Sequence, residues 1–282
     1  MEEININYPL AKQDHLIQQL PQFRIIKRGA RQKGVERFYQ TKDKKTSVNI
    51  RMFKELDIAD QDLLLAILAI AFVTNRGNEL SNESKRYQEL WSRLETEGIF
   101  AKWNTLCIET SYYELLNELN KPQGGSGQKW IDESLKRLVG TNIFIETEEF
   151  KGGSNFVSYY IDKQTKKIHI AINPVSAVVL LGDKKGFILH NRKERLTLNT
   201  TPARALYSIL VGMVNQKKSK TLSIPMLIEK MHFIEWEEAT TQQRKDLKKS
   251  FKVAIAEINK LKEWKIKDNL NNTITIIRGQ RG

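Results

Sequence analysis

The residues that could do chemistry gather in one polar, basic segment between Thr240 and Glu263. Glutamine and arginine side chains pair with adenine and guanine edges in the major groove, whereas lysines mostly bind phosphate. The polar residues crowd the first half of the segment: Thr241, Gln242, Gln243, Arg244, Lys245, Lys248, Lys249 and Lys252. This composition predicts a DNA contact in which the first four of these residues face base edges and the lysines bind phosphates.

These side chains need a helix to hold them on one face. At about 100° per residue, the apolar residues fall on one arc and most of the basic residues fall on the opposite arc. The apolar arc contains Leu247, Phe251, Ala254, Ile255, Ile258 and Leu261. A recognition helix presents its N-terminal residues to the major groove in this way, which favours DNA binding. An ordinary amphipathic surface helix with a solvated lysine face fits the same pattern and stays open.

Two further basic groups lie outside this helix. A two-stranded hairpin with its turn at Asn269–Asn272 is expected to follow, and its strands carry Lys265, Lys267 and Arg278. Near the start of the chain, the sequence FRIIKRGARQK at 23–33 predicts a basic arm. Its candidate contacts are Arg24, Lys27, Arg28, Arg31 and Lys33. Such arms add charge-driven affinity for DNA, and a solvated basic tail is the alternative.

No catalytic or metal-binding constellation emerges from the sequence. None of the four histidines has metal-ligand spacing with another histidine or with Cys107, the single cysteine. Asp60 and Asp62 could imitate a two-metal carboxylate pair, but acidic residues are ordinary at the start of a helix. The glycine-rich stretch at 124–129 lacks the ending of a phosphate-binding loop. We therefore predict no enzymatic activity, no metal and no cofactor, with a nuclease or primase as the enzymatic alternative.

The composition indicates an anionic partner. Lys and Arg total 46 against 33 Asp and Glu, a net charge of +13. Residues 183–282 hold 21 basic and 10 acidic side chains, residues 24–54 hold 11 basic and 2 acidic ones, and the region between these blocks is net acidic. This partition predicts two separate phosphate-facing regions. The lone cysteine, the absence of a signal-peptide pattern and the short apolar stretches predict a soluble, cytoplasmic protein with no role at a membrane.

The order of predicted elements repeats along the chain. A helix capped by Asp60 is followed by a short strand, two helices and a hairpin whose turn is expected at 152–154. The same order begins again at Thr200 and includes the basic helix. Helix, strand, helix, helix and hairpin is the order of a winged helix-turn-helix. The sequence therefore predicts an α+β fold of two tandem winged helix-turn-helix domains, residues 1–182 with the basic arm and residues 183–282 with the DNA-binding helix. A further hairpin is expected at 35–41 and 47–53.

Several stretches resemble the replication initiator protein C of IncQ-type plasmids. They are FRIIKRGARQK at 23–33, the helix at 60–71 with its preceding strand, SLKRLV at 134–139, the run from KKIHIAINP at 166–174 through 202–212, the unit at 220–231 and the long basic helix. The resemblance implies two winged-helix domains without enzymatic activity. It also implies binding to direct repeats (iterons) at a plasmid origin, melting of an adjacent AT-rich stretch, and action with the plasmid's replicative helicase and primase.

A winged-helix transcriptional regulator that binds an operator is the alternative within DNA-binding proteins. A regulator of that kind is expected to bind an inverted repeat as a symmetric dimer, whereas an initiator should prefer several head-to-tail repeats. Assembly into a homo-oligomer is compatible with both. An RNA-binding or membrane-surface protein is disfavoured, because the sequence has no RNA-binding sheet motif and no basic amphipathic helix with an aromatic face.

Overall fold

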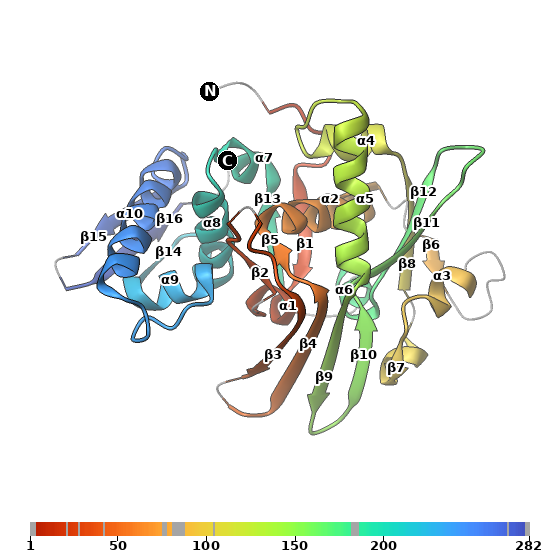
Figure 1. The fold of residues 1–282 in the computed structure, drawn as a ribbon, viewed down its shortest axis with the longest axis horizontal. Coiled ribbons are helices and arrows are strands. Elements are labelled where there is room, and N and C mark those ends of the chain that lie inside the picture. Colours follow the sequence, from red (N-terminus) through yellow and green to blue (C-terminus); the bar gives the residue numbers. More distant parts are fainter. Residues whose placement is uncertain are drawn as a thin grey trace.

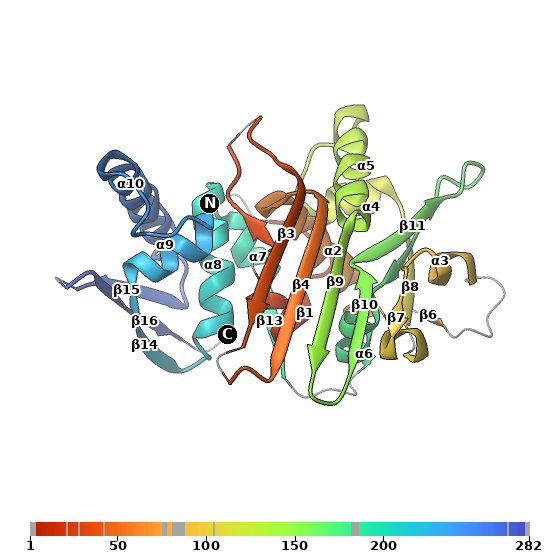
Figure 2. The same ribbon diagram turned by 60° about the horizontal axis from the view of Figure 1, so that its bottom comes forward.

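The computed structural model describes residues 4–20, 22–27, 29–41, 43–74, 78–80, 88–103, 105–181, 186–269 and 271–279. Helices and strands are mixed along the chain. The elements that follow Thr200 form a smaller unit beside a larger one, and the same division is visible from a second direction (Figures 1 and 2).

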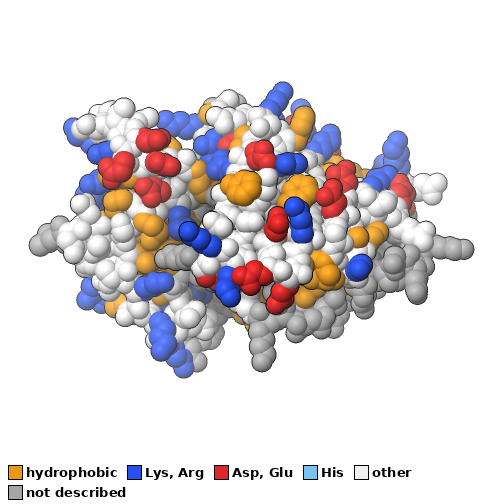
Figure 3. Space-filling view, turned by 90° about the horizontal axis from the view of Figure 1, so that it is seen from below, with side chains coloured by type: hydrophobic (Ala, Val, Ile, Leu, Met, Phe, Trp, Pro, Cys, Tyr) orange, Lys and Arg blue, Asp and Glu red, His pale blue; other side chains and the backbone are white. Residues whose placement is uncertain are grey.

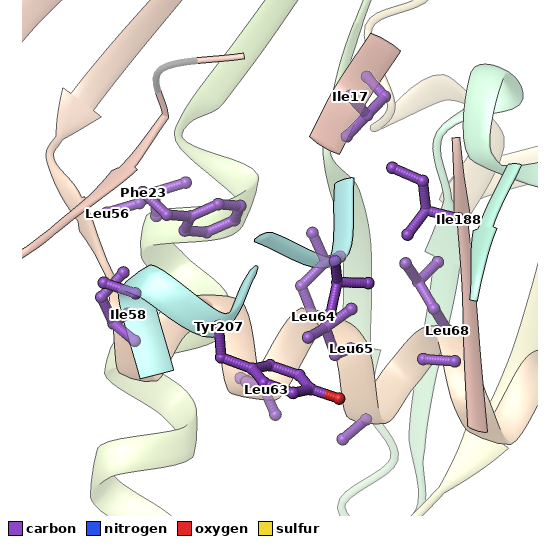
Figure 4. Close-up of a cluster of buried hydrophobic side chains, with 14 of the residues drawn as sticks. Ile17, Phe23, Leu56, Ile58, Leu63, Leu64, Leu65, Leu68, Ile188 and Tyr207 are labelled. Carbon is purple, nitrogen blue, oxygen red and sulfur yellow. The ribbon is translucent and has the colours of Figure 1, made fainter. Parts of the chain in front are cut away.

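Helix α2 (Ile58–Thr74) forms the centre of the larger unit. Every residue from Leu63 to Ala71 is buried, so this helix is apolar on all sides and lies within the core. The side chains that surround it come from distant parts of the chain. Figure 4 shows among them Ile17, Phe23, Leu56, Ile188 and Tyr207.

The start of α2 differs from the expected start. Asp57 provides the cap, since its Oδ1 atom accepts hydrogen bonds from the backbone N–H groups of Ala59 and Asp60, each at 2.9 Å. The prediction that Asp60 caps the helix is wrong. The Asp60 carboxylate is fully buried and binds the Arg137 guanidinium at 2.7 Å, so it is committed to a tertiary contact.

A five-stranded antiparallel sheet forms one face of the larger unit and turns toward the viewer in Figure 2. On its second strand the buried residues Val48, Ile50 and Met52 alternate with Asn49 and Arg51, so one face lines the core and the other faces solvent. The predicted hairpin at 35–41 and 47–53 is confirmed as the first two strands. In spatial order the strands are β3 (Lys33–Gln40), β4 (Thr46–Lys54), β9 (Thr141–Thr147), β10 (Lys151–Asn155) and β7 (Glu97–Gly98).

Gly152 and Gly153 lie inside strand β10, so the prediction of a turn at 152–154 is wrong. A Cβ atom on Gly152 would lie 2.8 Å from the Phe100 ring, and one on Gly153 would lie 2.5 Å from the Phe144 ring. The glycines therefore leave space for two aromatic rings to pack on the sheet. A pair of glycines in a strand often marks such a close approach.

The other elements of the larger unit pack around α2. A four-stranded sheet has the order β11 (Val157–Ile161), β12 (Ile168–Ile172), β8 (Thr105–Thr110) and β6 (Asn78–Leu80). Two strand pairs are β1 (Leu10–Asp14) with β13 (Phe187–Asn191) and β2 (Phe23–Arg24) with β5 (Leu56–Asp57). The helices are α1 (His15–Gln19), α3 (Gln88–Ser92), η1 (Ile99–Lys102), α4 (Tyr112–Glu118), α5 (Gly125–Val139), α6 (Pro174–Leu181) and α7 (Arg192–Thr197).

The smaller unit packs three helices on a three-stranded sheet, in the element order that the sequence predicts. The helices contact one another in pairs, and the sheet has the order β14-β16-β15. Its elements are α8 (Thr201–Met213), β14 (Lys218–Ser223), α9 (Ile224–His232), α10 (Thr241–Ile258), β15 (Trp264–Asp268) and β16 (Thr273–Arg278).

Buried ion pairs hold α7 on the rest of the larger unit, and Asp62 also reaches α8 of the smaller unit. Asp62 of α2 binds Arg195 of α7 at 2.5 Å and Arg204 of α8 at 3.0 Å. Glu118 of α4 binds Arg192 of α7 at 2.7 Å, and both side chains are almost fully buried. Strand β13 and helix α7, which follow residue 182, therefore pack on the larger unit and join it to α8.

Candidate nucleic-acid interface

A capping box starts helix α10 at the position that the sequence predicts. The Thr240 hydroxyl accepts a hydrogen bond from the Gln243 backbone N–H at 3.2 Å, and the Gln243 side-chain oxygen accepts one from the Thr240 N–H at 2.8 Å. This reciprocal pair satisfies two backbone groups that a helix start otherwise leaves without an intrahelical partner. The Gln243 side chain is thus built into the start of the helix.

The outward face of α10 carries most of the predicted contact residues. Its inward row, Leu247, Phe251, Ala254 and Ile258, is buried against the smaller unit. Besides Gln243, which the capping box holds, the exposed predicted contacts are Thr241, Gln242, Lys245, Lys249 and Lys252. Four-residue and three-residue spacing places them along one side of the helix. The structure therefore gathers these five residues into one solvent-facing strip.

Lys248 and Arg244 lie at the edge of this strip and contact the turn between α9 and α10. The Lys248 ammonium lies 5.5 Å from the centre of the Trp236 ring and 3.4 Å from the Asn272 side-chain oxygen in the β15–β16 turn. The Arg244 guanidinium donates hydrogen bonds to the backbone oxygens of Trp236 and Glu237, at 3.0 and 2.9 Å. Both cations thus connect α10 to neighbouring segments.

The hairpin places its three basic residues differently. Lys265 and Lys267 of β15 are exposed. Arg278 of β16 is buried, lies over the Trp264 ring and donates a hydrogen bond to the backbone oxygen of Val214 at 2.8 Å. Arg278 therefore stabilises the end of α8 inside the fold, while the two lysines face solvent on the side of β15 opposite the buried Ile266.

Two arginines of the basic arm are held by carboxylates of the larger unit. Arg24 binds Glu55 at 2.6 Å, and Arg31 binds Asp60 at 2.9 Å and also Asp57. Burial alone would raise the pKa of the Glu55 carboxyl, but hydrogen bonds from Arg24 and from the Gln32 N–H outweigh it and hold that pKa below its usual value. Glu55 is therefore ionised and holds the arm in place.

The arm also reaches the smaller unit. The Ile25 N–H donates a hydrogen bond to the Met231 oxygen of α9 at 3.1 Å. Burial, together with the nearby cations of Lys27 and Arg24, lowers the pKa of His232 to about 4. Lys27 and Lys33 are exposed. The predicted contact Arg28 lies outside the described residues.

The carboxylates that could imitate a metal site are bound by arginines. Asp60 accepts hydrogen bonds from Arg137 and from the Ser134 hydroxyl, and Asp62 is bound by Arg195 and Arg204. Within the described ranges, no cluster of three or more His, Cys, Asp or Glu side chains could hold a metal ion. Cys107 is buried in β8. None of the described helices is long and apolar enough to cross a membrane.

Two features were missed at the level of sequence. The buried arginine–carboxylate pairs of Glu118 and Asp62 join residues more than 70 positions apart, and no local pattern indicates them. The outer face of the five-stranded sheet exposes Phe38 and Phe53, with 74% and 72% of their surface accessible. The sequence does contain a signal for the exposed rings. Alternation along the two strands puts Phe38 and Phe53 on the face that also carries Asn49 and Arg51.

Two solved structures share this arrangement over almost the whole chain. Domains 2 and 3 of RctB align with a TM-score of 0.58 and 10% sequence identity, covering 95% of this chain and 99% of that structure. The Pi initiator protein in complex with iteron DNA aligns with a TM-score of 0.55 and 11% identity, covering 98% and 100%. The chain therefore shares its fold with these two structures.

The family is given by a direct sequence match. The model of the replication protein C (RepC) family matches residues 11–280, and the chain belongs to this family. No relative is found among curated protein sequences.

Proposed function

We propose that this protein is a plasmid replication initiator of the IncQ type, and that the smaller unit is a winged helix-turn-helix that binds iteron repeats through α10. The observation that carries the proposal is the exposed strip on α10 with its three lysines. The order α8, β14, α9, α10, β15 and β16 is that of a winged helix. The likeness to an initiator solved with iteron DNA supports the same assignment.

The larger unit is proposed as a second, modified winged helix. Helix α2, strand β8, helices α4 and α5 and the β9–β10 hairpin follow the same order, although β8 pairs with β12 instead of with that hairpin. The outer side of α5 mixes Lys129 and Lys136 with Asp132 and Glu133. Because the two acidic residues repel phosphate, this unit is assigned contacts with proteins and auxiliary contacts with the DNA backbone.

The mechanism in this proposal uses binding energy alone. Contacts along several repeats favour a deformed duplex, and the cost of deformation is lowest in an adjacent AT-rich stretch that opens. The plasmid's helicase and primase then act on the opened strands. The protein contributes no covalent chemistry in this scheme, and it acts in the cytoplasm, where the plasmid resides.

Footprinting of the purified full chain on the DNA that flanks its gene tests this function. We expect protection of several direct repeats about two helical turns apart, followed by increased permanganate reactivity in a neighbouring AT-rich stretch. Protection of a single inverted repeat, with no strand opening, would instead favour the transcriptional regulator. Metal-dependent cleavage or primer synthesis by the same preparation would contradict the absence of enzymatic activity.

Self-association is assigned to the outer face of the five-stranded sheet. Figure 3 shows this face, where hydrophobic side chains lie among basic and acidic ones. Glu36 and Arg51 pair across the exposed surface at 3.0 Å, so the face carries both signs of charge and can match a second copy turned around a two-fold axis.

Replacing Phe38 and Phe53 together with serine is expected to shift the protein from dimer to monomer, because two exposed rings lose their apolar contact area. Sedimentation velocity over a range of concentrations measures the change. Replacing the exposed Tyr113 of α4 with serine serves as the control and should leave association unaltered. A wild-type chain that stays monomeric throughout would refute the assignment.

A further inference from the structure

The turn between α9 and α10 holds one of the residues that base recognition would need. Arg244 donates from Nε to the Trp236 oxygen and from Nη2 to the Glu237 oxygen, at 3.0 and 2.9 Å. Its guanidinium carbon also lies 5.5 Å from the centre of the Trp236 ring. Two hydrogen bonds and a cation–π contact therefore fix the fork of this side chain against the turn.

The position of Arg244 on the helix explains this orientation. Residues three and seven positions later, Leu247 and Phe251, are buried and belong to the inward row. Arg244 therefore lies beside the core-facing side of α10, whereas Thr241 and Lys245 lie on the exposed strip. A bidentate contact with guanine needs the outer edge of the guanidinium to point into the groove. Reaching that geometry would break both hydrogen bonds to the turn.

Gln243 is committed in a similar way. Its side-chain oxygen accepts the Thr240 N–H, while a bidentate contact with adenine requires both the oxygen and the nitrogen of the amide. Gln242 is different, because its amide donates to the exposed Asp246 at 3.1 Å, a contact that a base edge can replace. Thr241 is exposed at the first position of the helix.

From these contacts we infer that Arg244 is a positioning residue, which sets the angle of α10 through its contacts with Trp236. Thr241 and Gln242 then provide the base selectivity. This inference rests on the proposed DNA-binding function of α10. Lys248 contributes to the same arrangement, since its ammonium also lies over the Trp236 ring and donates a hydrogen bond to Asn272 in the hairpin turn. The turn, the helix and the hairpin are thereby held as one rigid surface.

The test measures affinity for a set of duplexes, each carrying one protected direct repeat with a single base pair replaced. Arg244→Met should weaken binding to every duplex by the same factor, roughly tenfold, because both charge-assisted hydrogen bonds that position α10 are lost. The ratio of the affinity for the native repeat to the affinity for each altered repeat should stay the same as in the wild type. Thr241→Ala and Gln242→Ala should instead lower that ratio at particular base pairs.

A double-mutant cycle separates positioning from a general loss of folding. If Arg244 acts with the Trp236 ring, the affinity lost by the Trp236→Leu/Arg244→Met protein should be smaller than the product of the two single losses, and Arg244→Lys should recover part of the affinity. All variants are compared at a temperature where circular dichroism shows them fully folded. Loss of discrimination at one base pair in Arg244→Met, or unchanged affinity, would overturn the inference. A wild-type chain that protects no repeat would overturn the proposed function instead.

Discussion

Replacing Lys245, Lys248 and Lys249 together with alanine is expected to weaken binding to DNA of any sequence and to flatten its dependence on salt. Lys245 and Lys249 are exposed on the strip, and Lys248 lies at its edge. Each lost phosphate contact lowers the slope of log affinity against log salt by roughly 0.9, so the slope should fall by about 2 to 3. Affinity at about 0.1 M salt should fall on the order of a hundredfold. Fluorescence anisotropy at several salt concentrations measures both quantities.

A matched control removes the same charge elsewhere. Lys102, Lys163 and Lys167 are exposed and belong to the larger unit, and the strands β11 and β12 that flank the last two lie on the side away from α10 (Figure 1). Their replacement with alanine should change the slope much less, because only long-range electrostatics is affected. If the α10 variant kept the wild-type slope, docking through this strip would be incorrect.

Replacing Asp62 with asparagine is expected to cost about 3 to 5 kcal/mol of stability, the range for breaking a buried ion pair. The Arg195 side chain is only 1% exposed and would keep its charge without the carboxylate that now binds it. Arg204 would lose the same partner, but it is 27% exposed and can be solvated. Urea unfolding followed by circular dichroism measures the effect.

Two comparisons make this prediction specific. Glu36→Gln breaks the exposed pair of Glu36 with Arg51, whose side chains are 53% and 61% accessible, and should cost far less stability because solvent screens the pair. Asp62→Leu combined with Arg195→Met removes both buried charges and should recover most of the loss. Equal destabilisation by Asp62→Asn and Glu36→Gln would contradict a structural role for the buried pair.

The smaller unit was the more predictable part of the fold. Its core positions recur at helical and strand periods, and the capping box at Thr240 and Gln243 marks the start of α10. The end of the helix was less predictable. The segment was expected to continue to Glu263, but the helix ends at Ile258, and the Asn259 side chain binds both backbone groups of Ile266 in β15. Only the folded sheet brings that partner within reach.

The basic residues show what composition leaves undecided. The arm at 23–33 has the charge of a DNA contact, yet Arg24 and Arg31 bind carboxylates on strand β5 and its surroundings, which are adjacent only after β2 and β5 pair. Arg278 could have been placed inside from the pattern alone. It follows Ile274 and Ile276 at two-residue intervals, so strand alternation puts it on their buried face.

The pairing of β1 with β13 has a consequence for synthesis on the ribosome. Residues 10–14 find their strand partner at 187–191, and Arg192 supplies the cation for Glu118 and a hydrogen bond to the Tyr8 oxygen. Strand β1 of a nascent chain therefore stays unpaired until residues 187–191 have emerged from the ribosome. A fragment that ends at residue 182 lacks β13, so it should expose the edge of β1 and aggregate. A chain that extends past α7 contains β13 and can complete the fold of the larger unit.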